Sequence, residues 1–158
     1  DMGGPVNKVA YTFGVAGLTA AGTSTTGAGL THMAAVMAAG MTPPLGLALA
    51  TVVRKSLFTE AEHENGKAAW VLGATFITEG AIPFAAADPA RVIPSIMVGS
   101  GITGALVALF GNELRAPHGG IFVFPLVSNW LTYVLAIAIG TVITALLVLV
   151  AKGIGAKK

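Results

Sequence analysis

One carboxylate interrupts a long uncharged run of this sequence and is the residue best suited to chemistry. Glu79 stands at the twelfth position of residues 68–87, a run of twenty residues with no other Asp, Glu, Lys or Arg. If this run enters a membrane, the charge costs about 2.5 to 3.5 kcal/mol on insertion scales, so Glu79 must face protein or water. Its carboxylate is then either a structural group bonded to free backbone amides or a site for a ligand or a proton. Thr78 beside it places a hydroxyl group within reach of a polar substrate.

Two histidines and one asparagine are further candidates, and each has an ordinary structural alternative. His32 lies in an apolar stretch, where it is either a packing residue or part of a functional site. His118 lies in APHGGIF, where glycine lets the backbone approach a ligand closely, although a solvated loop histidine fits as well. Asn7 offers both donors and an acceptor to the hydroxyl groups of a ligand, and a helix cap explains it equally. These three residues, with Thr78 and Glu79, form the predicted binding set.

Several other kinds of chemistry are disfavoured by the composition. The chain has no cysteine, which removes disulfides, thiolate nucleophiles and thiolate metal ligands. The histidines lie far apart in sequence with no ligand pair at helical spacing, so no metal site is expected. No glycine-rich phosphate loop of the Walker type is present, and no cofactor is predicted. The formal charge of +2 is too small and too scattered to indicate nucleic acid binding.

The composition indicates that these residues lie in a membrane protein. Hydrophobic residues make up 54% of the 158 residues and only 10% are charged, while the mean hydropathy is +0.81. A helix needs about 20 apolar residues to cross the hydrocarbon core. Four intervals are long enough and nearly free of charge: residues 9–53, 68–87, 92–112 and 116–151. The sequence therefore predicts an all-α membrane protein.

Charge clusters and helix breakers divide the chain into five apolar segments and one aqueous loop. The loop is residues 54–67, which mix three basic with three acidic residues. The expected segments are residues 9–22, 28–53, 68–87, 92–112 and 121–151. The first is short and is read as a half-helix or a helix end. Residues 130–151 are expected to form the clearest spanning helix, with Lys152 as an anchor at the membrane surface.

Two segments contain helix-breaking residues and are expected to be broken or re-entrant. Pro43 and Pro44 interrupt residues 28–53, because proline removes a backbone donor and clashes with the preceding turn. Pro83 interrupts residues 68–87, and this second segment is the expected re-entrant hairpin. Unpaired backbone groups facing lipid would be costly, so such breaks persist where protein or a watery cavity receives them. Paired interrupted segments point to the binding site of a transporter.

Four stretches of the sequence together resemble the fructose-type IIC permease domain of the bacterial sugar phosphotransferase system. They are DMGGPVNK, HMAAVMAAGMTPPLG, FITEGAIPFAAADPARVIP and APHGGIF, which follow the family's order over nearly the whole chain. The resemblance implies a multi-pass protein of the bacterial inner membrane. It also implies a homodimer with a scaffold half and a substrate-binding half built around re-entrant hairpins. Residues 1–158 are similar to the second half.

The resemblance implies a function and roles for the candidate residues. A IIC domain carries fructose across the membrane while a partner IIB domain, charged as a phosphocysteine, phosphorylates the sugar. Glu79 is similar in position to the glutamate that related permeases use to bind sugar hydroxyls, and it becomes the candidate catalytic residue. His32 and His118 match histidines of the family motifs. A family domain is longer than this chain, so the chain is expected to begin inside a longer protein and to be inactive alone.

Two other classes of function stay open from the residues themselves. A cation-coupled secondary sugar transporter would use Glu79 to exchange a proton and the broken helices to bind the coupling ion, with no phosphorylated partner. A structural membrane subunit would pack through its small residues and would leave Glu79 unexplained. Fructose as the substrate follows from the resemblance alone.

Overall fold

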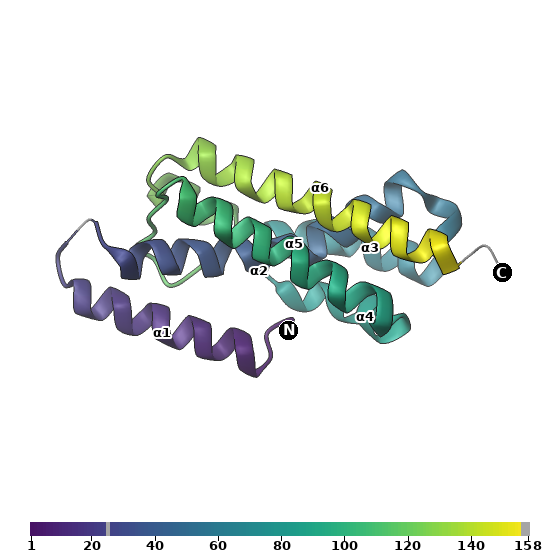
Figure 1. The fold of residues 1–158 in the computed structure, drawn as a ribbon, viewed down its shortest axis with the longest axis horizontal. Coiled ribbons are helices and arrows are strands. Elements are labelled where there is room, and N and C mark those ends of the chain that lie inside the picture. The colour runs from purple at the N-terminus through teal and green to yellow at the C-terminus, as the bar shows by residue number, and fades with distance from the viewer. Residues whose placement is uncertain (25, 156–158) are drawn as a thin grey trace.

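The computed structural model describes residues 1–24 and 26–155, which fold into helices joined by short loops (Figure 1). The α-helices are α1 (Pro5–Ala21), α2 (Ala28–Val53), α3 (Glu60–Ala74), α4 (Ile82–Ala87), α5 (Pro89–Leu109) and α6 (Trp130–Gly155). Single turns of 3₁₀ helix are η1 (Lys55–Leu57) and η2 (Thr78–Ala81), and η3 (Ile121–Leu126) is slightly longer. The described residues are 81% helical and contain no strand. The predicted all-α fold is confirmed.

Three of the helices are long and apolar enough to cross a membrane. They are α2, α5 and α6, with 26, 21 and 26 residues. α2 packs against α1, α3, α5 and α6 and is therefore the central element of the bundle (Figure 1). α6 begins at the predicted Trp130 and continues to Gly155, so the expected spanning helix is confirmed. Residues 68–87 do not form a spanning helix, because α3 ends within them and η2 and α4 follow.

The predicted break in residues 28–53 is wrong, because α2 runs through Pro43 and Pro44 without interruption. An α-helical N–H normally donates to the carbonyl oxygen four residues earlier. Proline has no N–H, so the two prolines leave the carbonyl oxygens of Ala39 and Gly40 without their usual helical donors. A helix buried in the centre of the bundle cannot offer these oxygens to bulk water.

Hydroxyl groups from two other elements replace the lost backbone donors. Ser100 Oγ of α5 donates to the carbonyl oxygen of Ala39 at 3.1 Å. Thr78 Oγ1 of η2 donates to the carbonyl oxygen of Gly40 at 2.7 Å. The helix stays continuous because tertiary hydrogen bonds satisfy both carbonyls, which removes most of the cost of unpaired buried polar groups.

The chain between α2 and α5 forms a hairpin that enters the bundle and returns to the end from which it came. α3 runs back along α2, η2 turns the chain, and α4 leads it to the start of α5 (Figure 1). The tip lies halfway along α2, because Thr78 contacts Gly40 there. At the base, Ser56 and Arg91 line one surface pocket together with Lys152 of α6. The predicted re-entrant segment, residues 68–87, forms the second part of this hairpin, from the end of α3 through η2 and α4.

The predicted aqueous loop, residues 54–67, is only partly a loop. It contains η1 and the first half of α3. Thr59 begins α3 with a capping box, in which the Glu62 backbone N–H donates to Thr59 Oγ1 at 3.3 Å. The Thr59 backbone N–H donates in return to the Glu62 carboxylate at 2.8 Å. The charges of this segment therefore start a helix, because acidic groups and hydroxyls satisfy the free N–H groups of its first turn.

A second re-entrant segment, residues 110–129, was not predicted. Asn112 is fully buried at its base and donates through its side-chain nitrogen to the carbonyl oxygens of Ser128 and Asn129, at 2.8 and 3.1 Å. It also donates to the hydroxyl of Thr132 at 2.9 Å. These bonds tie the two ends of the segment together, so the residues between them fold back into the bundle.

A buried ion pair joins α6 to the start of α3. Lys152 Nζ lies 2.7 Å from Glu62 Oε1, and the two side chains are only 10% and 6% exposed. The ammonium group also lies 4.6 Å from the centre of the Phe58 ring. Burial raises the pKa of the Glu62 carboxyl. Hydrogen bonds from Lys152 and Thr59, together with the positive charge of Lys152, lower it by more, so the pKa lies below its ordinary value of 4.5. Lys152 is thus a structural cation and not the predicted surface anchor.

Lys152→Met should destabilise the fold by about 3 to 5 kcal/mol, because it leaves the Glu62 carboxylate buried without its partner. The folded-state pKa of Glu62 is depressed, so its contribution to stability is present above pH 4.5 and is lost as the pH falls through the folded-state value. Thermal unfolding of the detergent-solubilised protein at pH 7 and at pH 4 measures both effects. The control is Lys67→Met, since the Lys67–Glu64 pair is exposed and worth about 0 to 1 kcal/mol. If the two substitutions lowered the stability equally, the Glu62–Lys152 pair would not have the larger contribution expected of a buried pair.

α5 and α6 approach each other through two reciprocal contacts between glycine and threonine. Thr144 of α6 lies directly on Gly99 of α5, and Thr103 of α5 lies directly on Gly140 of α6. A methyl group on either glycine would overlap the threonine side chain. Small residues of this kind let membrane helices approach closely enough for dispersion contacts to hold them together.

Gly99→Ala should lower the free energy of unfolding by about 1 to 3 kcal/mol, because the added methyl group must push α5 and α6 apart. Gly101→Ala in the same helix is the matched control, since no heavy atom lies within 4 Å of the methyl position. Alanine is the better helix former, so the control should be neutral or slightly stabilising. The midpoint of thermal unfolding in detergent separates the two variants. A similar loss in both would show that α5 and α6 do not pack through Gly99.

Candidate functional site

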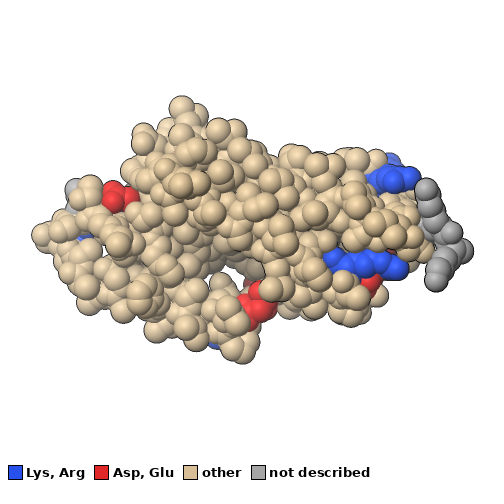
Figure 2. Space-filling view, viewed as in Figure 1, with Lys and Arg blue, Asp and Glu red and all other residues tan. Residues whose placement is uncertain are grey.

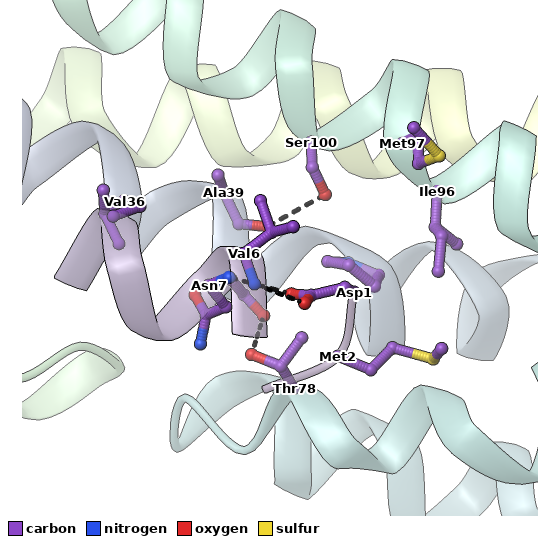
Figure 3. Close-up of a pocket in the computed structure, with 13 residues that line it drawn as sticks. Asp1, Met2, Val6, Asn7, Val36, Ala39, Thr78, Ile96, Met97 and Ser100 are labelled. Carbon is purple, nitrogen blue, oxygen red and sulfur yellow. Dashed lines mark hydrogen bonds between the residues drawn. The ribbon is translucent and has the colours of Figure 1, made fainter. Parts of the chain in front are cut away.

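A cavity of about 180 Å³ opens where α1, the middle of α2, the tip of the first hairpin and α5 meet (Figure 3). Two of the predicted site residues, Asn7 and Thr78, lie in its wall. Apolar side chains cover most of the remaining wall, among them Val36, Ile96 and Met97. A largely apolar cavity with a few polar groups is typical of a small-molecule site.

The start of α1 is held at this cavity by a carboxylate. Asp1 accepts hydrogen bonds from the backbone N–H groups of Val6 and Asn7, at 2.8 and 2.9 Å (Figure 3). Pro5 occupies the first helical position, where its missing N–H costs nothing. The helix therefore begins earlier than the predicted residue 9. The alternative interpretation of Asn7 as a helix cap is wrong, because Asp1 supplies the cap and Asn7 lies inside α1.

Glu79 is not among the residues that line the cavity; its exposed side chain lies at the rim, next to Thr78, which is part of the wall. It follows Thr78 in η2, and its carboxylate packs so closely on Gly3 that a methyl group there would come within 2.5 Å of Oε1. Gly3 follows Met2, which lines the cavity. Acidic side chains lie beside a hollow on this face of the molecule (Figure 2). The carboxylate thus adjoins both the cavity and water.

His32 connects α2 to α1. Its Nε2 donates to the carbonyl oxygen of Ala10 at 2.9 Å. Its ring meets the ring of Phe13 edge to face, with 4.9 Å between the centres. His32 lines an apolar groove with Val6 and Val9 on α1, whereas Ala10 lines both that groove and the cavity. The structure therefore places His32 behind α1, where it holds a wall of the cavity in position.

His118 lies at the tip of the second re-entrant segment, which meets the first hairpin at Phe76. The rings of His118 and Phe76 are 6.1 Å apart. Gly119 lies directly on one face of Phe76, and a methyl group on Gly40 of α2 would come within 2.5 Å of the same ring. Phe76 has a positive φ of 66°, which is rare for a bulky residue. The Phe76 ring of the first hairpin thus lies between Gly119 of the second segment and Gly40 of α2.

The structure brings together some of the predicted residues and adds others. Asn7 and Thr78 share the cavity, Glu79 lies at its rim, and His118 reaches the hairpin tip only through Phe76. Sequence reasoning missed Ser100 and the free carbonyl groups of α2. The two consecutive prolines were the available signal, because they determine which two carbonyls lose their donors.

The sequence is similar along nearly its whole length to fructose-specific components of the phosphotransferase system (PTS). It is 62% identical over 155 residues to the PTS system fructose-specific EIIB'BC component of Rhodobacter capsulatus, which covers 96% of this chain and 26% of that protein. It is 49% identical over 147 residues to the PTS system fructose-specific EIIC component of Haloferax volcanii, covering 93% of this chain and 37% of that protein. The chain is a homologue of part of the fructose-specific EII components.

Other comparisons define the extent of this homology. The chain is 47% identical over 152 residues to the fructose permease IIC component of Bacillus amyloliquefaciens, and covers 47% of that protein. It therefore spans between a quarter and a half of the EII components named here. No protein-family model and no solved structure matches the chain. Homology to EIIC components and three helices of spanning length and composition together indicate a membrane protein.

Proposed function

We propose that this chain is the substrate-binding part of a fructose IIC permease in the bacterial inner membrane. A IIB partner would phosphorylate the sugar as the permease carries it across, and two copies of the permease would form a homodimer. The observation that carries the proposal is the cavity at the hairpin tip, lined by Asn7 and Thr78 and bordered by Glu79. The names of the relatives support it, since they include EIIC, EIIB'BC and EIIABC components specific for fructose.

The chemistry of the cavity suits an uncharged sugar. A hexose carries no net charge, so its recognition depends on hydrogen bonds to each hydroxyl group. Asn7 offers an amide, and the hydroxyl oxygen of Thr78 keeps acceptor capacity after it donates to Gly40. The apolar side chains around them exclude water and strengthen each of these bonds. His118 would contact Phe76 and so orient the tip of the first hairpin. His32 would hold α1 in position through its bond to Ala10.

Glu79 would act on the hydroxyl group that receives the phosphoryl group. In the transfer, the bond between sulfur and phosphorus of the IIB phosphocysteine breaks and a bond forms between phosphorus and the sugar oxygen. The hydroxyl proton passes to Glu79 as general base, or the carboxylate positions the hydroxyl in a largely dissociative transfer. Its place at the rim leaves it open to a partner, as this reaction requires. The relatives give no support to the cation-coupled alternative.

Uptake of labelled fructose should depend strictly on a phosphorylated IIB partner. The measurement uses membrane vesicles that contain the complete permease, with and without phosphorylated IIB, and identifies the internal product. Group translocation yields fructose phosphate inside the vesicles only when the donor is present. Accumulation of unmodified fructose without the donor would overturn the proposed function and favour a secondary transporter.

Glu79→Gln should lower the rate of fructose phosphorylation by about 10² to 10⁴-fold and leave fructose binding largely intact. Glutamine keeps the hydrogen-bonding capacity of the side chain, but it cannot accept the proton as a general base. Binding of labelled fructose and phosphorylation rate are measured on the complete permease. Glu64→Gln is the control, because Glu64 is an exposed residue paired with Lys67 on α3. If both activities survive in Glu79→Gln, the carboxylate is structural.

A further inference from the structure

We propose that the two carbonyl oxygens freed by Pro43 and Pro44 bind hydroxyl groups of the sugar, and that Ser100 determines specificity beside them. This inference rests on the proposed function and names the groups that recognise its substrate. The two carbonyls belong to Ala39 and Gly40, and both residues line the cavity together with Pro43 and Ser100. The binding wall is therefore built from the backbone of α2 and one side chain of α5.

The geometry leaves each of these groups able to accept another hydrogen bond. A carbonyl oxygen has two lone pairs, and Ser100 and Thr78 each use one hydroxyl hydrogen to occupy one of them. The second lone pair of each carbonyl and the lone pairs of both hydroxyl oxygens stay available. Figure 3 shows the Ser100 and Thr78 bonds on opposite sides of the same space. This wall favours a neutral ligand with several hydroxyl donors and disfavours a phosphate group, which offers mainly acceptors.

The position of the prolines argues against a purely structural role. Alanine at either position would supply the missing N–H and stabilise the helix, because proline within a helix is unfavourable. The chain instead has two consecutive prolines, of which Pro43 lines the cavity, and both deprive carbonyls of cavity-lining residues of their donors. By contrast, the hydroxyl group of Thr42 bonds to the carbonyl of Ala38 in the fully buried core, where no ligand can reach. The carbonyl groups of Ala39 and Gly40 instead belong to residues that line the cavity.

The test measures kcat and KM for fructose in vesicles that contain the complete permease and phosphorylated IIB. Ser100→Ala should raise the KM by about 3- to 10-fold, as expected for one neutral hydrogen bond, with kcat changed less than about twofold. Ser95→Ala is the matched control, because Ser95 lies on the same helix and bonds only to the carbonyl of Arg91 within it. The control should leave the KM unchanged.

A second variant separates recognition from folding. Pro43→Ala supplies an N–H that competes for the carbonyl oxygen of Ala39 and should also raise the KM, while the thermal stability stays equal or rises. A structural role for Pro43 would give the stability change without the change in KM. Fructose analogues in which one hydroxyl is replaced by hydrogen complete the design. One analogue should lose affinity in the wild type and show no additional loss in Ser100→Ala, which identifies the hydroxyl that Ser100 contacts.

The outcomes distinguish this inference from the proposed function. Donor-dependent uptake with an unchanged KM in both Ser100→Ala and Pro43→Ala would overturn the inference and leave the permease function in place. An equal rise in KM for Ser95→Ala would also overturn it, because the effect would then belong to α5 packing in general. Absence of donor-dependent fructose uptake by the wild type would overturn the proposed function and the inference together.

Discussion

Two missing backbone hydrogen bonds in the central helix organise the rest of this structure. α2 passes through Pro43 and Pro44 while buried on most sides, so the carbonyls of Ala39 and Gly40 must find donors outside the helix. Ser100 supplies one from α5 and Thr78 supplies the other from the hairpin tip. The same two bonds therefore complete the helix, position its neighbours and define one wall of the cavity.

The second feature of the site is the meeting of two re-entrant segments halfway along α2. Phe76 lies between Gly40 and Gly119, and neither glycine leaves space for a side chain. Irregular backbone at this depth of a membrane is stable only where protein or an aqueous cavity surrounds it, and here both do. The two segments start from opposite ends of the bundle. Because their tips meet beside Gly40, the chain at Glu79 and the chain at His118 both lie about halfway along α2.

Rigid contacts away from the cavity hold this arrangement in place. The Glu62–Lys152 pair ties α6 to the base of the first hairpin, and the reciprocal contacts at Gly99 and Gly140 hold α5 against α6. At the cavity, η2 and α5 each donate one side-chain hydrogen bond to α2.

The sequence by itself determined the helical membrane class, the long apolar helix that begins at residue 130 and the residue types suited to bind a polar ligand. Those conclusions depend on local charge, apolar length and helix breakers, which act within one segment. Only the tertiary structure decided that α2 stays continuous, that residues 110–129 fold inward and that Ser100 joins the cavity. Each of these depends on a partner distant in sequence. Thr78 lies 38 residues from its acceptor Gly40, and Ser100 lies 61 residues from its acceptor Ala39. No local pattern identifies such a donor, because any element that packs beside the carbonyl can supply it.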